Sequence, residues 1–179
     1  MRSTDIIGDR QLLSLFAALR GGSMSAFEEI YAALSKPVYT VALRIAGERT
    51  LAEDITQEVF IKLFSSPPDS SVKKPRAYIF AMTHNAAINS LKKLSQYENI
   101  ECAEDIPDSR SLQTSAEKRL DIAAALAKLP REEREVVTLH VNGGFKFREI
   151  AQIMGIPTGT AAWRWSKAVN TLRQILDEL

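Results

Sequence analysis

Residues 147–167 constrain the fold more than any other part of the chain, because they predict two short helices joined by a tight turn. Gly155 suits the left-handed residue that commonly ends a helix, and Pro157 prevents that helix from continuing. Thr158 can cap the second helix. This pattern is typical of an ordinary helical hairpin, or of a unit that places its second helix in the DNA major groove.

The second helix of this pair has two contrasting faces. At about 100° per residue, the apolar face consists of Ala161, Trp165, Ala168, Leu172 and Ile175, and the opposite face consists of Thr160, Trp163, Arg164, Lys167 and Thr171. In the first helix, Ile150, Ala151 and Met154 form the matching apolar patch. The two cations on the outward face favour the DNA-binding interpretation over a plain hairpin.

Helical periodicity continues through the rest of the chain, and no strand pattern interrupts it. Ser25 and Glu28 form a capping-box pattern ahead of a helix that reaches residue 35, and Pro37 suits the start of the next helix. Polar and acidic residues around Pro107 indicate a linker.

We therefore expect an all-α protein with two helical domains joined by a flexible acidic linker. The expected helices are 11–20, 26–35, 37–46, 50–64, 75–94, 116–129 and 131–141, and the expected divisions are a domain at 1–94, a linker at 95–115 and a helix-turn-helix domain at 116–179.

Charge is distributed unevenly, although the net charge is only +1. Basic residues gather at 62–93 and at 146–173, and acidic residues gather between these two zones. Such zones are typical of solvated helix faces or, when two occur together, of two modules that contact phosphates.

Composition excludes several other classes of protein. The chain has no run of about 18 apolar residues that could span a membrane, and its first residues show no secretory signal pattern. Its single cysteine, Cys102, cannot form an internal disulfide, and no Cys/His cluster suggests zinc. We expect a cytoplasmic protein with neither a metal nor a cofactor.

Three motifs together resemble the extracytoplasmic-function group of bacterial RNA polymerase sigma factors, which retains the second and fourth sigma regions. The motifs are LAEDITQEVFIKLF (51–64), KPRAYIFAMTHNAAINSLKK (74–93) and LPREEREVVTLHVNGGFKFREIAQIMGIPTGTAAWRWSKAVNTLR (129–173). Each is moderately specific, and their order and spacing make the combination strong. The resemblance implies a non-catalytic factor that binds core RNA polymerase and recognises and melts promoter DNA.

The resemblance also implies a role for the residues of each motif. The first motif would bind core polymerase through Glu53, Asp54, Gln57, Glu58 and Lys62. The second would melt the promoter and read the minus-ten element through Lys73, Lys74, Arg76, Tyr78, His84, Asn85, Asn89, Lys92 and Lys93, while the loop at 65–74 would capture a flipped base. The third would read the minus-thirty-five element through Arg148, Thr158, Thr160, Trp163, Arg164 and Lys167.

Tyr78 and Phe80 cannot both face DNA, because positions two apart on a helix diverge by about 200°. We expect Tyr78 to lie beside the melted strand and Phe80 to pack inside. Cations along the strand and aromatic rings against its bases are the groups that hold single-stranded DNA.

The chain departs from the family pattern at several of these positions. Ala162 and Trp163 replace a usual lysine and serine in the recognition helix, and His84 and Asn89 replace a usual arginine and aspartate in the melting helix. Trp163 would then pack against thymine methyl groups and sugars, or contact a protein partner. These changes leave the preferred promoter sequence open.

Two other functions remain as alternatives to an initiation factor. A helical partner-binding protein or anti-activator could keep the sigma shape without initiating transcription. A small enzyme using His84 or His140 as a base is disfavoured, because neither histidine has a partner at helical spacing that would tune its pKa. For a sigma factor we expect core polymerase, double- and single-stranded promoter DNA and an anti-sigma protein as partners, and a monomer when free. Cys102 could sense oxidants, but a lone cysteine is more often incidental.

Overall fold

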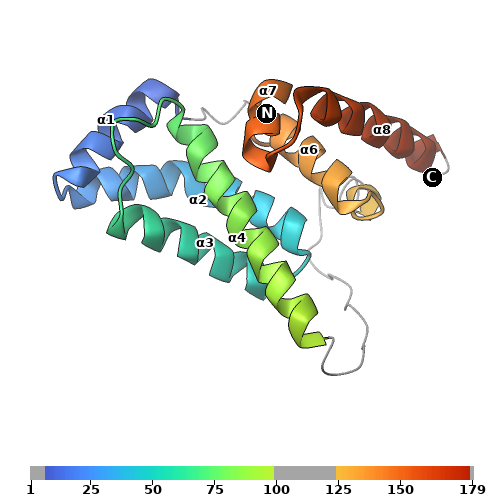
Figure 1. The fold of residues 1–179 in the computed structure, drawn as a ribbon, viewed down its shortest axis with the longest axis horizontal. Coiled ribbons are helices and arrows are strands. Elements are labelled where there is room, and N and C mark those ends of the chain that lie inside the picture. The colour runs from blue at the N-terminus through green and yellow to red at the C-terminus, as the bar shows by residue number, and fades with distance from the viewer. Residues whose placement is uncertain (1–6, 99–123, 178–179) are drawn as a thin grey trace, which may run out of the picture.

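The computed structural model describes residues 7–98 and 124–177, and helices dominate both segments (Figure 1). The helices are α1 (Asp9–Arg20), α2 (Met24–Ala46), α3 (Arg49–Ser65), α4 (Pro75–Glu98), α6 (Arg131–Val141), α7 (Phe147–Met154) and α8 (Thr158–Asp177). A short helical turn at 124–127 precedes α6. No strand occurs in the part of the chain that the structure describes, so the expected all-α class is confirmed.

The first half of the chain is a bundle in which α2, α3 and α4 pack against one another and α1 packs across α2 and α4. On α2 the residues that face inward recur at helical spacing: Ile30, Leu34, Val38 and Val41 are fully buried. Asp9 of α1 accepts a hydrogen bond from the backbone N–H of Arg76, at 3.2 Å, and thereby caps the first turn of α4.

Residues 24–46 form one helix, whereas the sequence predicts two. The N-cap is Ser23, whose Oγ accepts the N–H of Ala26 at 3.3 Å, so the capping box expected at Ser25 and Glu28 is wrong. Pro37 lies inside the helix. Pro37 removes one backbone hydrogen bond, but the buried residues on both sides of it keep their partners only if the helix continues. Packing therefore outweighs the local preference for a break.

The helix α4 extends to Glu98, four residues beyond its expected end at Leu94. The expected linker at 95–115 therefore begins inside a helix, and its remaining residues lie outside those described. The first part of the helix expected at 116–129 also lies outside them.

The second half of the chain is the expected helix-turn-helix, preceded by α6. Gly155 has φ 65° and ψ 34°, which confirms the left-handed residue after α7. Helix α8 begins at Thr158, with the carbonyl of Pro157 accepting the N–H of Ala161 at 3.2 Å, so Thr158 is the first helical residue rather than the cap. Ala161 and Ala168 of α8 are fully buried.

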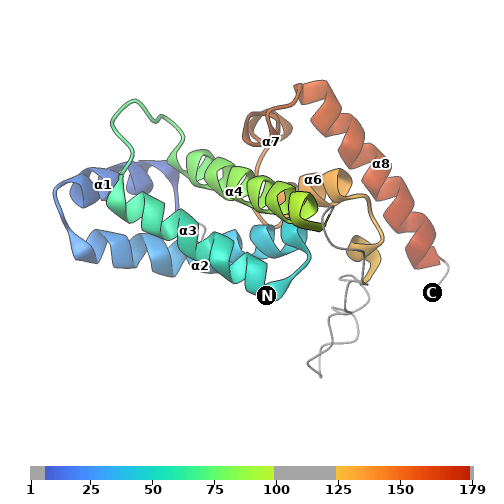
Figure 2. The same cartoon turned by 60° about the horizontal axis from the view of Figure 1, so that its bottom comes forward.

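The two halves share one continuous hydrophobic core. Helix α6 packs against α2, and α7 packs against α4, so residues from both halves belong to the same buried cluster (Figures 1 and 2). In the described segments, no helix is both long enough and apolar enough to cross a membrane.

Candidate nucleic-acid interface

The residues expected to contact the minus-ten element all lie on α4 or just before it, and the structure divides them into two groups. Lys73, Asn85, Asn89, Lys92 and Lys93 are exposed to solvent. Arg76, Tyr78 and His84 are partly covered, and Lys74, although exposed, is engaged in an ion pair. For Arg76, Lys74 and His84, the contacting groups come from the second half of the chain.

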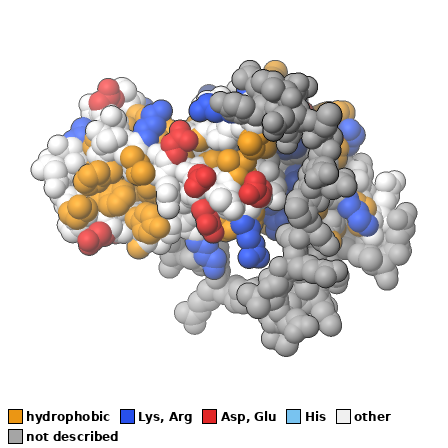
Figure 3. All heavy atoms as spheres, turned by 90° about the horizontal axis from the view of Figure 1, so that it is seen from below, with side chains coloured by type: hydrophobic (Ala, Val, Ile, Leu, Met, Phe, Trp, Pro, Cys, Tyr) orange, Lys and Arg blue, Asp and Glu red, His pale blue; other side chains and the backbone are white. Residues whose placement is uncertain are grey.

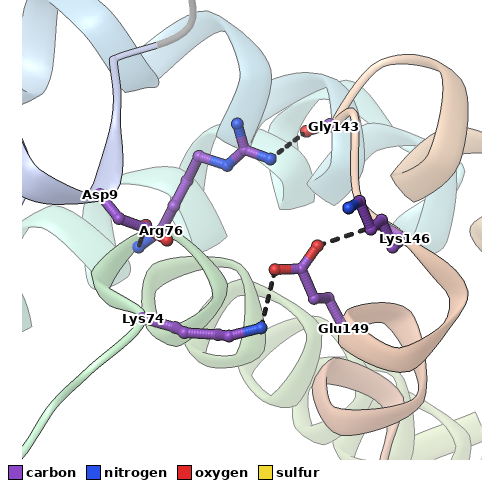
Figure 4. Close-up of polar contacts among 6 residues, drawn as sticks. All are labelled: Asp9, Lys74, Arg76, Gly143, Lys146 and Glu149. Atoms are coloured by element: carbon purple, nitrogen blue, oxygen red, sulfur yellow. Dashed lines mark hydrogen bonds and ion pairs between the residues drawn. The ribbon is translucent and has the colours of Figure 1, made fainter.

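Arg76 points from the first turn of α4 toward the loop that joins α6 to α7 (Figure 4). Its Nη2 donates a hydrogen bond of 2.9 Å to the carbonyl oxygen of Gly143, and its guanidinium lies 4.4 Å from the centre of the Phe145 ring. Phe145 is 1% exposed and also meets Phe80 edge to face, with ring centroids 4.9 Å apart. The loop therefore contacts Arg76 in two ways, through a hydrogen bond and through an aromatic ring.

Lys74 forms an ion pair of 3.0 Å with Glu149, the third residue of α7 (Figure 4). The other oxygen of Glu149 accepts the N–H of Lys146 at 3.1 Å and so caps α7. Burial alone would raise the pKa of Glu149. The hydrogen bonds from Lys146 and Lys74, and the positive charges of Lys74 and Arg76, outweigh that effect and hold the pKa below its usual value.

His84 lies farther along α4, where its Nδ1 contacts Oε1 of Glu135 on α6. Both side chains are largely withdrawn from water, and Glu135 is 2% exposed. A carboxylate so deeply buried requires a partner of this kind. His84 is thus part of the contact between the two halves.

Phe80 is buried and Tyr78 is partly exposed, as expected from their positions on the helix. Tyr78 borders a shallow cleft of about 310 Å³ between the loop at 66–74, α4 and α7. Lys74, Ser71 and Gln152 also line this cleft. It combines an aromatic ring, a cation and an amide, which are groups suited to a nucleobase and its phosphate.

On α8, the residues expected to read duplex DNA differ in accessibility. Trp163 is 59% exposed, and the ammonium of Lys167 lies 5.2 Å from the centre of its ring. Thr158 is also exposed, and Thr160 is partly exposed. The Arg164 side chain is only 15% exposed and pairs with Glu132, while Lys167 pairs with Glu133 at 2.9 Å. Arg148 is exposed on the neighbouring α7.

The polar face expected on α3 is present and open to solvent. Glu53, Asp54, Gln57, Glu58 and Lys62 are all exposed. Beside them lies an exposed apolar patch that the sequence pattern did not single out, formed by Met24, Tyr31, Ile61 and Phe64 (Figure 3). Ile61 and Phe64 are apolar residues of α3, yet both are exposed beside its polar face.

The other group that sequence reasoning missed is a set of four glutamates: Glu132, Glu133 and Glu135 on α6 and Glu149 on α7. Each contacts one of the basic side chains expected to bind DNA. Three of these glutamates stand close together in the sequence, in the run Arg-Glu-Glu-Arg-Glu at 131–135. The sequence does not show which basic side chains they contact, because those side chains lie far away along the chain.

Comparison with known proteins agrees with this arrangement of helices. The family model of Sigma-70 region 2 matches residues 30–97, and the model of Sigma-70, region 4 matches residues 119–172. The ECF RNA polymerase sigma factor SigL of Mycobacterium tuberculosis (strain ATCC 25618 / H37Rv) is 30% identical over 170 residues, covering 91% of this chain and 94% of SigL. SigK of Mycobacterium ulcerans is 23% identical over 177 residues, covering 93% and 94% of the two chains.

Solved structures share the fold at lower sequence identity. CnrH, in complex with the cytosolic domain of CnrY, superposes with a TM-score of 0.70 at 20% identity, over 94% of this chain and 98% of that one. The sigma factor RpoE, in complex with the anti-sigma factor NepR from Bartonella quintana, gives a TM-score of 0.70 at 23% identity, over 84% and 96% of the two chains.

The region 2 and region 4 matches, in that order along one chain, are those of a Sigma-70-type factor. With SigL matched over nearly its whole length, the chain belongs to the extracytoplasmic-function (ECF) group of RNA polymerase sigma factors. It is an alternative sigma factor, which directs transcription initiation at promoters.

Proposed function

We propose that this sigma factor divides its work among three helices: α3 binds core RNA polymerase, α4 melts and reads the minus-ten element, and α8 reads the minus-thirty-five element. The observation that carries the proposal is the opposite charge of two neighbouring helices. Helix α3 exposes Glu53, Asp54 and Glu58, whereas α4 and the two residues before it expose lysines at both ends. An acidic face suits a protein partner, and a basic face suits a nucleic acid.

The docking surface for polymerase combines the polar face of α3 with the apolar patch beside it. Charged groups guide encounter and fix the register of two partners, while buried aromatic and aliphatic side chains supply most of the affinity. Ile61 is 65% exposed and also lines a shallow depression with Asp54, Gln57 and Glu58. The two kinds of group thus lie on one continuous surface.

The proposed DNA contacts follow from the side chains that α4 and α8 present. Lys73, Lys92 and Lys93 would neutralise phosphates, and Tyr78 would stack on an unpaired base. On α8, Arg164 and Lys167 would contact base edges or phosphates in the major groove, once released from their glutamates. Trp163 would pack against thymine methyl groups, or contact a protein partner.

An anti-sigma protein is the proposed regulatory partner. The support is that both solved relatives were captured with another protein, in one case an anti-sigma factor named as such. We further propose that the chain is monomeric when free, acts in the cytoplasm beside RNA polymerase, and performs no catalysis of its own.

Run-off transcription with core RNA polymerase on genomic fragments tests this proposal directly. We expect promoter-specific transcripts that depend on both proteins. Transcripts should disappear when Lys92 and Lys93 are both replaced by Glu, because the phosphate-binding end of α4 is then acidic. Failure of the wild-type protein to direct initiation on any fragment would instead favour a partner-binding protein that keeps only the sigma shape.

A further inference from the structure

Helix α1 contacts the loop between α3 and α4, residues 66–74, at both ends of the loop (Figures 1 and 2). Near the beginning of the loop, Nη1 of Arg20 donates a hydrogen bond to the carbonyl oxygen of Pro68. Just after its end, the carboxylate of Asp9 accepts the N–H of Arg76 at 3.2 Å (Figure 4). Asp9 and Arg20 are the first and last residues of α1, so one helix spans the whole loop.

We propose that Arg20 is a positioning residue for base recognition, which holds the 66–74 loop in the shape that accepts one unpaired base of the minus-ten strand. The inference rests on the proposed role of α4 in reading that strand. It adds that a residue of α1, outside the helices proposed to bind DNA or polymerase, determines how selectively the strand is read. Arg20 acts through the loop and does not itself contact the base.

Helix α1 is a firm support for such a contact. Its apolar face, formed by Leu12, Phe16 and Leu19, is buried, and the helix packs against α2 and α4. Two residues after the helix, Gly22 has φ 84°, a left-handed conformation that turns the chain toward α2. Arg20 therefore extends from the last turn of an anchored helix, and its guanidinium reaches the loop from a fixed backbone.

The contact with Arg20 lies next to the turn that forms the tip of the loop. Pro68 is buried, whereas the residues at 69–71 are exposed. In this turn, Oδ1 of Asp69 accepts the N–H of Ser71 at 2.8 Å. Hydrogen bonds from the hydroxyl and the N–H of Ser71 hold the pKa of Asp69 below its usual value, and the positive charge of Arg20 adds to that effect. Arg20 thus joins the turn to α1 through the residue that precedes it.

The tip of the loop also forms one wall of the cleft beside Tyr78. Ser71 and Val72 line this cleft of about 310 Å³ together with Tyr78. The hydroxyl of Ser71 can donate and accept hydrogen bonds, so it suits the edge of a base that stacks on the tyrosine ring. A loop that the base itself has to order loses part of its binding energy to that ordering. Arg20 orders the loop in advance.

Hydrogen–deuterium exchange in the free full-length chain tests whether Arg20 orders the loop. Arg20→Met removes the guanidinium and keeps an unbranched side chain. Arg10→Met is the matched control, because Arg10 is an exposed arginine of the same helix. We expect the amides at 66–74 to exchange about tenfold faster in Arg20→Met than in the other two proteins, the effect of losing one charge-assisted hydrogen bond. The amides of α1 and α4 should keep their protection.

Run-off transcription with the holoenzyme measures the effect on base selectivity. A promoter identified with the wild-type factor is changed to each of the four bases at every position of its minus-ten element. In Arg20→Met, the ratio of transcript from the best base to that from the worst should fall about tenfold at one position. At the other positions it should stay within about twofold of wild type, because only the base in the cleft meets the loop. Arg20→Lys should retain most of the selectivity, since lysine can also donate to the Pro68 carbonyl.

Several results would overturn the inference. Unchanged exchange at 66–74 in Arg20→Met would show that the loop does not depend on Arg20. Selectivity that is unchanged, or that falls equally at every position, would show that Arg20 does not position the loop for one base. Arg20→Lys no more selective than Arg20→Met would exclude the hydrogen bond to Pro68 as the cause. Failure of the wild-type factor to initiate would contradict the proposed function and, with it, this inference, whereas the preceding results contradict the inference alone.

Discussion

Phe145, in the loop between α6 and α7, lies edge to face against Phe80 of α4, with ring centroids 4.9 Å apart. Both rings are about 1% exposed. This aromatic pair joins the loop between α6 and α7 to α4, and so links the two halves of the chain.

Replacing Phe145 by Ala should lower the free energy of unfolding by about 3 kcal/mol, because truncation of a buried phenylalanine leaves a cavity as well as removing apolar contacts. Urea denaturation followed by circular dichroism measures the change. Trp163→Ala is the control, since that exposed ring should change stability by about 0.5 kcal/mol or less. A loss below about 1 kcal/mol for Phe145→Ala would contradict the packing described.

Gly143→Ala should destabilise the same loop for a steric reason. A Cβ at this position would lie 2.6 Å from the carbonyl oxygen of Leu139 and 2.6 Å from the Phe145 ring, so the backbone or the ring would have to shift. Gly159→Ala is the matched control, because nothing lies within 4 Å of its added Cβ in the first turn of α8. We expect a lower melting temperature for the first variant and an equal or higher one for the second. The opposite order would be inconsistent with this loop.

The pair of Glu149 with Lys74 should make stability depend on pH only on the acid side. The pKa of Glu149 is lower in the folded chain than its usual value of 4.5. The unfolded state therefore binds its proton first, and the stabilisation is complete above that usual value and is lost as the pH falls through the folded-state pKa. Urea midpoints measured from pH 6 to pH 3 should fall less steeply for Glu149→Gln than for wild type. Parallel curves for the two proteins would argue against the depressed pKa.

Ile61→Asp should weaken binding to core polymerase about tenfold or more, because it places a charge in the apolar part of the proposed docking surface. Surface plasmon resonance with immobilised core enzyme measures the affinity. Leu13→Asp is the control, an exposed leucine on α1 that lies outside this surface. Equal affinity for Ile61→Asp and wild type would place the polymerase contact elsewhere.

Arg164→Ala should reduce binding to the minus-thirty-five element by about 1–3 kcal/mol, the range for a well-placed arginine–base contact. Footprinting on a promoter obtained from the run-off assay measures the change. Arg173→Ala serves as the comparison, because this exposed arginine lies near the far end of α8. If Arg164→Ala protects the upstream element as well as wild type does, Arg164 does not contact this element. In the wild-type complex it would then stay paired with Glu132.

Local signals were sufficient to predict most of the helices and the turn between α7 and α8. Gly155 and Pro157 act on their immediate neighbours, so the break at that turn is visible in the sequence. Pro37 shows the limit of the same reasoning. Its local effect is to end a helix, but long-range burial of the residues around it keeps α2 continuous, and no window of neighbouring residues contains that information.

The sequence predicted which basic residues belong to the candidate site, but not which residues they contact. Lys74, His84, Arg164 and Lys167 stand out by residue type and by their place on predicted helices. Their glutamate partners lie between 32 and 75 positions away along the chain, and only the packing of α6 and α7 brings them together. The division between exposed and occupied basic residues therefore required the tertiary structure.

The buried cluster shared by the two halves also determines how their contact responds to temperature. Separating them would hydrate apolar side chains, including Phe145, and such hydration increases the heat capacity of the system. Because the hydrophobic contribution weakens on cooling, the halves should be held together less firmly in the cold than at room temperature. A modest fall in temperature should therefore weaken the contact between the two halves without any change in the residues that form it.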